Sequence, residues 1–379
     1  MKIVFIADSV YAHLSGLPCL FCGAERQQWL LGRALSAAGW KVTFGVQNGL
    51  PPGQREEIDG LEFVGIGQGA ALAAWGRFLF NERPDWWYWR GSYHLWGAGV
   101  ELAKLAGVRT IFACAFDSDV QPRNALTFRR RWWRLYAWGL TRNDRIVVQH
   151  RAQLAALADR WRSKATVVYS IAGSTADGMT PHWERDPYVA WVGMLRQHKR
   201  PDLLIEIARK SPGVRFIVCG APSTHRSPAG YGERCEQALK DLPNVDYRGY
   251  VAPEATDAII GRASLLLSTS DEEGFPNTFL QAWSAGTPVV SLGIDPDGVM
   301  TQGAFGAVSS DCDGIASRIN DLLGSPELRQ EMGERARRHV ATVHSAAAVT
   351  SAFEKMIESS TARTHEIIDT GPSVTSQNS

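Results

Sequence analysis

Short apolar runs alternate with longer amphipathic stretches along most of this chain. The runs have strand length and are bounded by Gly, Pro or Asp, whereas the stretches between them have helical periodicity. The expected strands are Lys2–Ala7, Lys41–Val46, Leu61–Val64, Asp85–Trp89, Thr110–Ala115, Arg145–Val148, Val167–Ala172, Tyr188–Val192, Val214–Cys219, Val245–Tyr250, Leu265–Leu267 and Val289–Val290. The expected helices include 24–38, 95–105, 128–140, 276–285, 314–323 and 327–356. Strands that alternate with helices predict an α/β fold with parallel, doubly wound sheets.

The length and composition predict two domains. A chain of 379 residues, 45% of them hydrophobic, exceeds the size that one core comfortably serves. A polar stretch over 173–186, which carries Gly and Pro, separates two sets of strands. We therefore expect a first domain over 1–175, a second over 186–345 and the end of a C-terminal helix at 346–358. Residues 359–379 are polar, and we expect this tail to be disordered.

The stretch from Ser268 to Val290 places polar groups where a buried strand gives way to a helix. Leu265–Leu267 predicts the strand, and Pro276–Thr278 opens the helix. The free N–H groups and the dipole at such a helix start favour an anion by about 0.3–2 kcal/mol, and a phosphate is the usual guest. Gly274 allows close approach of the backbone to that guest.

Glu273 and Gln281 are placed to meet a ligand that lies along the same helix start, and carboxylate and amide groups suit sugar hydroxyls. With Gly274, Phe275 and Pro276 the segment resembles the signature of the retaining GT-B glycosyltransferases of family 4, also called glycosyl transferases group 1. In that family a second Glu stands eight residues after the first. Gln281 replaces it here, which keeps a hydrogen-bonding group for a ribose and removes a charge.

The resemblance extends over roughly residues 1–358. It implies a GT-B fold, in which two Rossmann-like domains face a cleft, with the acceptor on the first domain and a nucleotide-sugar donor on the second. It also implies that the anomeric configuration of the transferred sugar is retained. The resemblance is stronger in the second domain than in the first.

Two further segments resemble parts of the family's diphosphate site. In CGAERQ, Gly23 matches a turn whose N–H groups approach the donor. In GMLRQHK, Lys199 matches a basic residue on the diphosphate, whereas Met194 stands where the family has Arg, and Arg196 is placed to supply that charge. Tyr250 belongs to a segment like the base-binding one. The donor-binding residues we expect are Gly23, Arg196, Lys199, Tyr250, Glu273, Gly274, Phe275, Pro276, Asn277 and Gln281.

Asp117-Ser118-Asp119 has the D-x-D pattern that holds a divalent metal in another glycosyltransferase fold. We interpret it as a loop at the end of a strand, because a complete second nucleotide-binding pattern follows it. The family often carries a His in this loop, and Phe116 or Asp117 takes that place here. We expect Lys199, Glu273 and Asp117 to be the catalytic residues. We expect no metal and no cofactor beside the nucleotide sugar.

The charge distribution adds candidate partners. Residues 1–175 carry 21 Lys and Arg against 13 Asp and Glu, a net +8, and the remainder carries −7. This asymmetry fits a phosphate-bearing acceptor or an acidic membrane face, and it also fits an ordinary uneven surface. The basic, Trp-rich helix over 128–140 is compatible with a membrane interface or with a solvated domain face. Its arginines are Arg129, Arg130, Arg131 and Arg134.

The chain has no apolar run of transmembrane length, and its start carries an acidic residue where a signal peptide is uncharged. The six cysteines are scattered and predict no disulfide framework. Cys19 and Cys22 form a C-x-x-C without a second pair at zinc-ligand spacing, and a redox or metal role for them remains a minor alternative. We expect a cytoplasmic protein, with peripheral contact at the inner membrane face as an open possibility.

Together the patterns predict transfer of a sugar from a nucleoside diphosphate sugar to a hydroxyl acceptor, in cell-surface polysaccharide or glycolipid assembly. A lipid-linked acceptor fits, and we expect no nucleic-acid partner. One alternative is a non-catalytic nucleotide-sugar-binding assembly protein. A second is a nucleotide-sugar epimerase, which would use groups such as His13 and His94. A nicotinamide oxidoreductase rests only on the G-x-G-x-x-A pattern at Gly65–Ala70.

Overall fold

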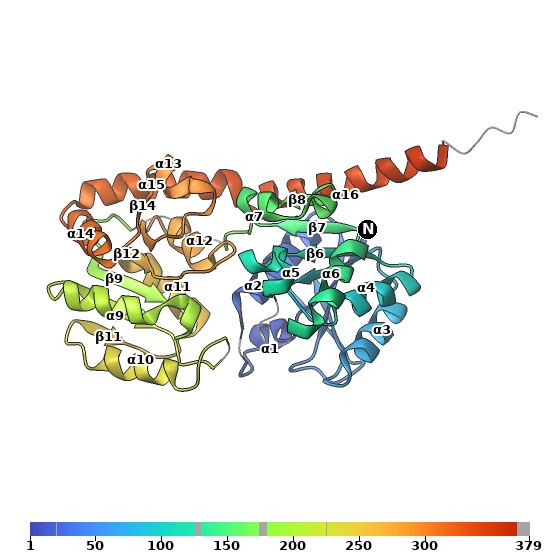
Figure 1. Cartoon of the computed structure of the whole chain (residues 1–379), viewed down its shortest axis with the longest axis horizontal. Helices are drawn as coiled ribbons and strands as arrows, with labels where there is room; N and C mark the ends of the chain where they lie inside the picture. Colours follow the sequence, from blue (N-terminus) through green and yellow to red (C-terminus); the bar gives the residue numbers. More distant parts are fainter. Residues whose placement is uncertain (20, 126–129, 174–179, 225, 370–379) are drawn as a thin grey trace, which may run out of the picture.

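The computed structural model describes the chain except for residues 20, 126–129, 174–179, 225 and 370–379. Two α/β domains lie side by side, each built on one sheet with helices packed against it (Figure 1). The expected fold class, two doubly wound Rossmann-like domains, is confirmed.

The first domain contains an eight-stranded sheet in the order β3-β4-β2-β1-β5-β6-β7-β8, parallel except for the β3–β4 pair. Its strands are β1 (Lys2–Ile6), β2 (Lys41–Val46), β3 (Arg55–Ile58), β4 (Leu61–Gly65), β5 (Trp86–Arg90), β6 (Arg109–Ala113), β7 (Arg145–Val148) and β8 (Ala165–Val167). Its helices are α1 (Val10–Leu14), α2 (Gly23–Ala37), α3 (Ala71–Glu82), α4 (Trp96–Leu105), α5 (Pro122–Ala125), α6 (Trp133–Arg142), α7 (Arg151–Ala156) and α8 (Asp159–Arg162), with 3-10 turns η1 (Asp117–Val120) and η2 (Arg130–Trp132).

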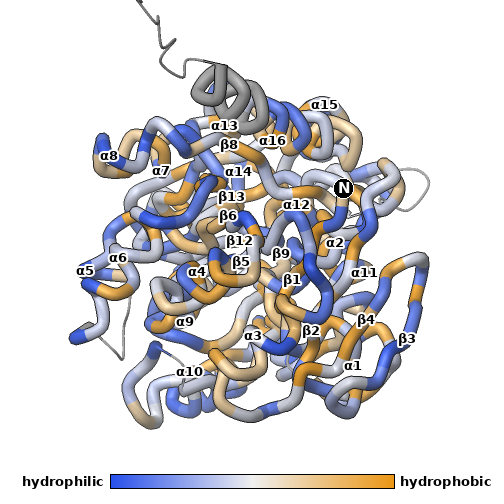
Figure 2. Tube along the Cα trace, turned by 90° about the vertical axis from the view of Figure 1, so that its right-hand side faces the viewer, coloured by the Kyte–Doolittle hydropathy of each residue, from blue (hydrophilic) through white to orange (hydrophobic). Residues whose placement is uncertain are grey.

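Both faces of this sheet are buried, which explains why its strands read as continuous apolar runs. In β1, Ile3 and Phe5 pack on one face with side chains of α2, whereas Val4 and Ile6 pack on the other with side chains of α3, α4 and α6. Figure 2 shows the apolar strands inside the molecule. Because the strands are parallel, their carboxyl ends lie at one edge of the sheet, and the cleft lies at that edge.

The second domain contains a six-stranded parallel sheet in the order β11-β10-β9-β12-β13-β14. Its strands are β9 (Asp186–Val192), β10 (Arg215–Cys219), β11 (Val245–Tyr247), β12 (Ala263–Ser268), β13 (Val289–Leu292) and β14 (Gly306–Ser309). Its helices are α9 (Pro201–Lys210), α10 (Tyr231–Lys240), α11 (Pro253–Arg262), α12 (Asn277–Ser284), α13 (Val299–Gly303), α14 (Cys312–Leu323) and α15 (Pro326–Val343), with 3-10 turns η3 (Gln197–Lys199) and η4 (Pro296–Gly298).

The last helix, α16 (Ala346–Asp369), leaves the second domain and packs on the first (Figure 1). Phe353 is fully buried in the first domain's core, and Trp40 Nε1 donates to Glu354 Oε1 at 3.0 Å. The helix continues through 359–369, where the composition led us to expect a disordered tail. The rest of that tail, 370–379, lies outside the described residues.

Two other segments differ from the expected elements. The strand β8 ends at Val167, and residues 168–172, called the crossing segment below, lead toward the second domain without forming a strand. The expected helix over 128–140 consists of the short turn η2 followed by α6. Arg129 lies outside the described residues.

Candidate active site

A cleft of about 550 Å³ lies between the domains, lined by loops that follow the strands and by the first turns of helices. Open α/β sheets bind ligands at such an edge. Most of the donor-binding residues expected from the sequence line it: Gly23, Arg196, Lys199, Tyr250, Glu273, Phe275, Asn277 and Gln281. Gly274 and Pro276 belong to the same loop, and Asp117 follows two lining residues, Ala115 and Phe116.

Two helices begin at this cleft, one from each domain. Gly23 and Ala24 line it at the start of α2, and Asn277 and Thr278 line it at the start of α12. The approach is close, because a Cβ at Gly23 would stand 2.3 Å from Asn277 Nδ2. The helix starts therefore place two sets of free N–H groups and two positive dipole ends around one space, an arrangement that favours an anion.

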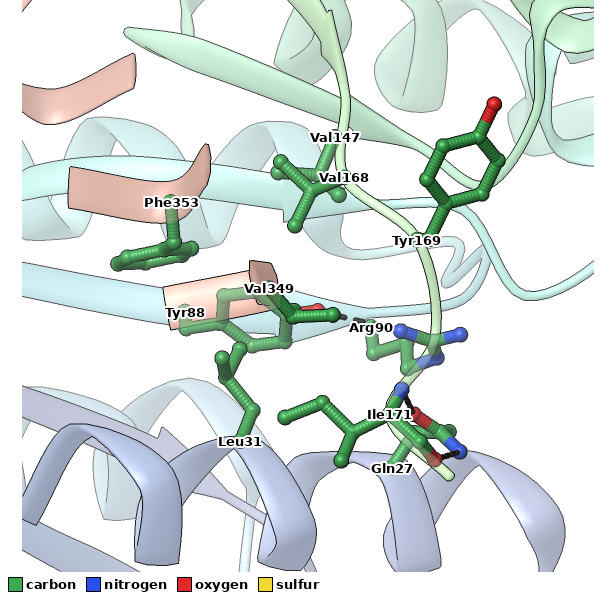
Figure 3. A pocket seen from close by; sticks show the side chains of 10 residues that line it. All are labelled: Gln27, Leu31, Tyr88, Arg90, Val147, Val168, Tyr169, Ile171, Val349 and Phe353. Atoms are coloured by element: carbon green, nitrogen blue, oxygen red, sulfur yellow. Dashed lines mark hydrogen bonds between the residues drawn. The ribbon is translucent and has the colours of Figure 1, made fainter. Parts of the chain in front are cut away.

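Asn277 joins the domains through Gln27 of α2. Gln27 Nε2 donates to Asn277 Oδ1 at 2.7 Å and to the Ile171 carbonyl at 2.9 Å, and Gln27 Oε1 accepts from Ile171 N at 2.8 Å. Figure 3 shows Gln27 against the crossing segment. One side chain thus connects the start of α12, helix α2 and the chain that passes between the domains.

Lys199 and Glu273 form an ion pair at the donor side of the cleft. They come from different parts of the second domain: Lys199 ends η3, and Glu273 precedes α12. The Lys199 carbonyl accepts from Thr269 Oγ1 at 2.7 Å, which ties η3 to the loop after β12. Glu273 is 8% exposed, so loss of Lys199 would leave a buried carboxylate without its ion-pair partner.

Arg196 supplies a second cation on the same wall. Its Nε donates to Ser223 Oγ at 3.1 Å, and burial lowers the pKa of Arg196 from its ordinary value. Met194, which stands where the family has Arg, also lines the cleft. Arg196, two residues after Met194, therefore lines the same cleft, and its role in place of the family's Arg stays a prediction.

Gly274 and Phe275 have separate structural tasks. A Cβ at Gly274 would stand 2.4 Å from the Ala115 carbonyl oxygen and 1.8 Å from the Gln149 side-chain amide, so only glycine fits against the first domain there. The Phe275 ring packs in the core, with its centroid 4.8 Å from His344 and 5.9 Å from Trp283. Phe275 therefore anchors the loop to the core of the second domain.

Gln281 belongs to a chain of polar contacts that spans the domains. Its Nε2 donates to Asp257 Oδ1, and Asp257 Oδ2 accepts from Arg26 Nη2 at 3.2 Å. The carboxylate absent at position 281 is therefore present next to it, on α11. No sequence pattern predicts this pairing, because Asp257 lies in a helix without a recognisable motif.

Asp117 is held by residues that follow β7. Its Oδ1 accepts from His150 Nε2 at 2.8 Å and from Gln153 Nε2 at 2.9 Å. His150 Nδ1 accepts from Gln153 N at 3.3 Å, so the hydrogen-bond pattern assigns the proton to Nε2. Asp117 N also donates to the Glu273 carbonyl at 3.3 Å, which joins this loop to the donor loop.

His150 is a residue that sequence reasoning missed. The histidine that the family carries in the loop after β6 is absent, but His150 from the end of β7 reaches Asp117. The sequence feature that could have identified His150 is its position two residues after the carboxyl end of β7. Asp297 lies close by, and it accepts from Arg151 N at 2.9 Å across the domain boundary.

Asp119, the second carboxylate of the D-x-D pattern, turns into the loop. Its Oδ2 accepts from Ala115 N at 2.6 Å and from Phe116 N at 3.0 Å, and burial raises its pKa. Asp117 and Asp119 thus have separate partners. Among the residues that the structure describes, no group of three or more His, Cys, Asp or Glu side chains is arranged to hold a metal ion.

Of the remaining features, the G-x-G-x-x-A pattern lies apart from the cleft, whereas Cys22 of the C-x-x-C and Tyr250 line it. Gly65, which opens the G-x-G-x-x-A pattern, packs against the loop before β3, because its Cβ would stand 1.9 Å from the Pro51 carbonyl oxygen. Cys19 and Cys22 are free thiols. Tyr250 is 56% exposed at the rim of the cleft, where its ring is available to a ligand.

The basic, Trp-rich segment forms an outer surface of the first domain. Arg131 and Arg134 are exposed, and Trp132 and Trp133 are half-buried against the core. Trp138 is 49% exposed, and its Nε1 donates to Glu101 Oε1 at 3.1 Å. In the described part of the chain, no helix is long and apolar enough to cross a bilayer.

The fold has close counterparts among solved structures. A sucrose-phosphate synthase from Thermosynechococcus elongatus superposes with a TM-score of 0.73 over 96% of this chain and 100% of that one, at 16% identity. The Anabaena protein HepE, solved in complex with UDP-glucose, gives a TM-score of 0.72 over 95% of this chain and 100% of that one, at 14% identity. These likenesses establish the GT-B architecture.

Sequence comparisons match part of the chain. A D-inositol 3-phosphate glycosyltransferase from Mycobacterium marinum is 32% identical over 178 residues, which are 44% of this chain and 37% of that protein. The chain thus matches less than half the length of this curated relative. Residues 179–339 match the model of the family glycosyl transferases group 1. The chain is therefore a two-domain protein of the GT-B fold, and residues 179–339, which form most of its second domain, are similar to the glycosyl transferases group 1 family.

Proposed function

We propose that this protein transfers a sugar from a nucleoside diphosphate sugar to a hydroxyl acceptor, with retention of the anomeric configuration. The observation that carries the proposal is the convergence of the α2 and α12 starts on one cleft beside Arg196 and the Lys199–Glu273 pair. This arrangement supplies N–H donors and cations for a departing diphosphate, and a carboxylate for the hydroxyls of the sugar.

Each part has a distinct task in this mechanism. Glycosyl transfer develops negative charge on the departing diphosphate, and fixed donors that face that charge lower the barrier. Lys199, Arg196 and the amides at Gly23 and Asn277 are placed to do this. Glu273 would then turn from Lys199 to the donor sugar and orient it, and retention corresponds to attack by the acceptor on the same face as the departing group.

The first domain supplies the acceptor side. Asp117 lies at its edge, half exposed and oriented by His150 and Gln153. A carboxylate with two fixed donors is positioned to accept a hydrogen bond from the attacking hydroxyl. We assign Asp117 this orienting role.

Donor and acceptor classes follow by analogy with the similar proteins. HepE was solved with UDP-glucose, which makes uridine diphosphate sugars the first donors to test. The Mycobacterium marinum relative is named for a phosphorylated inositol acceptor. A role in cell-surface polysaccharide or glycolipid assembly, on a lipid-linked acceptor at the inner membrane face, fits the exposed Trp138 and the basic surface around it.

We further propose that transfer needs no metal ion. The positive charge that a metal would bring to the diphosphate is available from Lys199, Arg196 and two helix starts. EDTA should therefore leave turnover nearly unchanged. Loss of activity in EDTA that Mg²⁺ or Mn²⁺ restores would return Asp117 and the D-x-D pattern to a metal role.

The experiment that tests the function is incubation with a panel of nucleotide sugars and hydroxyl acceptors, with assay of the released nucleoside diphosphate and NMR of the product's anomeric configuration. We expect acceptor-dependent release and a retained product. Binding of a nucleotide sugar without turnover would favour the assembly-protein alternative. Conversion of the bound sugar to an isomer without release would favour an epimerase.

A further inference from the structure

The basic side chains that line the cleft differ in how their charge is neutralised. Arg26 pairs with Asp257 at 3.2 Å, and Lys199 pairs with Glu273. Arg196 and Arg90 also line the cleft, but within the described residues neither forms an ion pair with a carboxylate. Arg196 lies on the donor wall and has a task in the proposed function. Arg90 has none.

Arg90 ends β5 and reaches the cleft from the first domain. Its Nη1 donates to Tyr88 Oη at 3.2 Å, and its Nη2 lies 3.5 Å from Ser170 Oγ. Figure 3 shows its guanidinium beside the crossing segment. When Gln149 is oriented so that its amide nitrogen donates to the Ala115 carbonyl at 3.3 Å, its oxygen accepts from Arg90 Nη2 at 2.5 Å. All three of these partners are neutral.

The same Gln149 amide contacts Gly274 of the donor loop, as the position of a Gly274 Cβ shows. Arg90 is therefore separated from the Glu273–Gly274 backbone by one side chain. It comes from the first domain, which carries net +8 up to residue 175, whereas Lys199 and Arg196 come from the second. A half-buried guanidinium with only neutral partners raises the free energy of the protein until an anion pairs with it.

We propose that Arg90 binds a phosphate group of the acceptor, next to the hydroxyl that receives the sugar. The inference rests on the proposed function and deepens it, because it makes the acceptor an anionic alcohol. In the proposed function the donor diphosphate lies at the α2 and α12 starts with Arg196 and Lys199, which line the same cleft as Arg90. A planar guanidinium suits phosphate because it donates two parallel hydrogen bonds.

The test uses wild type, Arg90→Gln, Arg90→Lys and, as a control on the donor wall, Arg196→Gln. Calorimetry first gives the affinity of each protein for UDP. The UDP-saturated proteins are then titrated with two matched pairs, inositol 1-phosphate against inositol and glycerol 1-phosphate against glycerol. Vesicles of phosphatidylinositol against phosphatidylcholine separate a lipid headgroup from a soluble phosphate as the source of the anion.

We expect wild type to prefer the phosphorylated member of at least one pair, or the phosphatidylinositol vesicles, by about 10-fold or more. Arg90→Gln should reduce that preference by about 10- to 100-fold and leave UDP affinity within about twofold, whereas Arg90→Lys should keep part of the preference. Arg196→Gln should show the reverse pattern. Thermal unfolding of each variant reports whether Arg90 instead only supports Ser170 and the crossing segment.

Three results would overturn the assignment. The first is a wild-type protein that binds UDP but shows no phosphate preference. The second is an Arg90→Gln protein that loses UDP affinity and keeps the preference, which would move Arg90 to the donor site. The third is a lower unfolding temperature for both Arg90 variants with the preference intact, which would make the role structural. A protein that neither binds nor consumes any nucleotide sugar would instead refute the proposed function, and this inference with it.

Discussion

At the scale of single residues, several polar side chains of the cleft are paired with one another in the structure. Lys199 and Glu273 form an ion pair, and the Gln281 amide donates a hydrogen bond to the Asp257 carboxylate. In the proposed function a donor that enters exchanges these contacts for its own, so the same side chains would stabilise the unliganded cleft and bind the donor.

Lys199→Ala should lower turnover by about 10²- to 10³-fold, or about 2.7–4 kcal/mol, because it removes a cation that faces the departing diphosphate. The measurement is kcat with a saturating donor, together with the unfolding temperature. Lys210→Ala is a matched control, since Lys210 pairs with Asp313 on an exposed face of α9. Unchanged turnover in a folded Lys199→Ala protein would refute the role.

Gln281 offers a test in which sequence and structure predict different results. The family resemblance predicts that Gln281→Glu, which restores the family's usual residue, is tolerated. The structure predicts otherwise, because the Asp257 carboxylate contacts the side chain of residue 281. We expect Gln281→Ala to raise the KM for the donor with kcat nearly kept, as for a contact remote from the reacting bond. Gln281→Glu should raise KM more at pH 8 than at pH 6, because two adjacent carboxylates avoid repulsion only while they share a proton.

The second change Asp257→Asn, added to Gln281→Glu, should return the KM toward the wild-type value. Steady-state kinetics on the two single variants and the double variant give the comparison. A Gln281→Glu enzyme that matches wild type at both pH values would show that the 257–281 contact does not persist when the donor is bound.

At the scale of elements, two buried histidines fasten chain segments to the second domain. His182 Nε2 donates to the Gly286 carbonyl at 2.8 Å, behind α12, and His344 Nδ1 donates to the Ser170 carbonyl at 2.8 Å, at the end of α15. Burial lowers the pKa of each histidine to about 4. Both rings are therefore neutral in the folded protein near neutral pH.

This predicts a loss of stability in acid. In the unfolded chain these histidines take up protons near pH 6.5, but in the folded protein only near pH 4. The free energy of unfolding should therefore be unaffected by them above about pH 6.5 and fall as the pH drops from there toward 4, by on the order of 3 kcal/mol per histidine. Unfolding temperatures at pH 7.5 and 5 should differ less in His182→Gln/His344→Gln than in wild type, and equal differences would contradict this account.

The basic segment over residues 129–134, which runs into the first turn of α6, predicts a membrane contact at the same scale. If its arginines meet anionic lipid, each contributes about 1 kcal/mol near the surface, and replacing all four with Gln should abolish binding to phosphatidylglycerol vesicles. The variant changes Arg129, Arg130, Arg131 and Arg134. The control removes as much charge from the second domain, at the exposed Arg209, Arg234, Arg262 and Arg338. Equal vesicle binding by wild type and the first variant would leave a solvated domain face.

At the scale of the whole molecule, the donor loop is also part of the domain interface. Gly274 contacts Ala115 and Gln149, and Asn277 contacts Gln27, so the residues that would hold the donor also hold the domains together. Helix α16 follows the second domain in the chain and packs on the first, which gives a second connection between the domains. The relative position of the domains and the geometry of the site are therefore coupled.

Gly274→Ala tests that coupling. The added methyl would meet a backbone carbonyl oxygen at 2.4 Å, so the domains must separate to accept it. We expect activity to fall by at least about 10²-fold, because small displacements of the reacting groups are costly. Small-angle scattering should show a larger radius of gyration and calorimetry a nearly unchanged unfolding temperature. Gly213→Ala, where a Cβ meets nothing within 4 Å, is the control, and an active, equally compact Gly274→Ala protein would contradict the coupling.

The sequence by itself determined the layers of the molecule and most of the donor wall. Apolar runs of strand length between amphipathic helices specify parallel sheets buried on both faces, and this information is local. The segments around Glu273, Lys199 and Gly23 are local as well, since each is a loop that ends a strand and opens a helix or 3-10 turn. In the structure these segments line one cleft, and their roles as donor ligands stay a prediction.

Tertiary structure alone decided which of these groups meet. His150 reaches Asp117 because β6 and β7 are neighbours in the sheet, and Arg26 reaches Asp257 because the two domains close on one another. Arg90 is a cleft residue because β5 lies beside β1 and ends at the same edge. Such contacts depend on strand order and domain position, which arise from the packing of the entire chain and leave no periodic or local trace in its sequence.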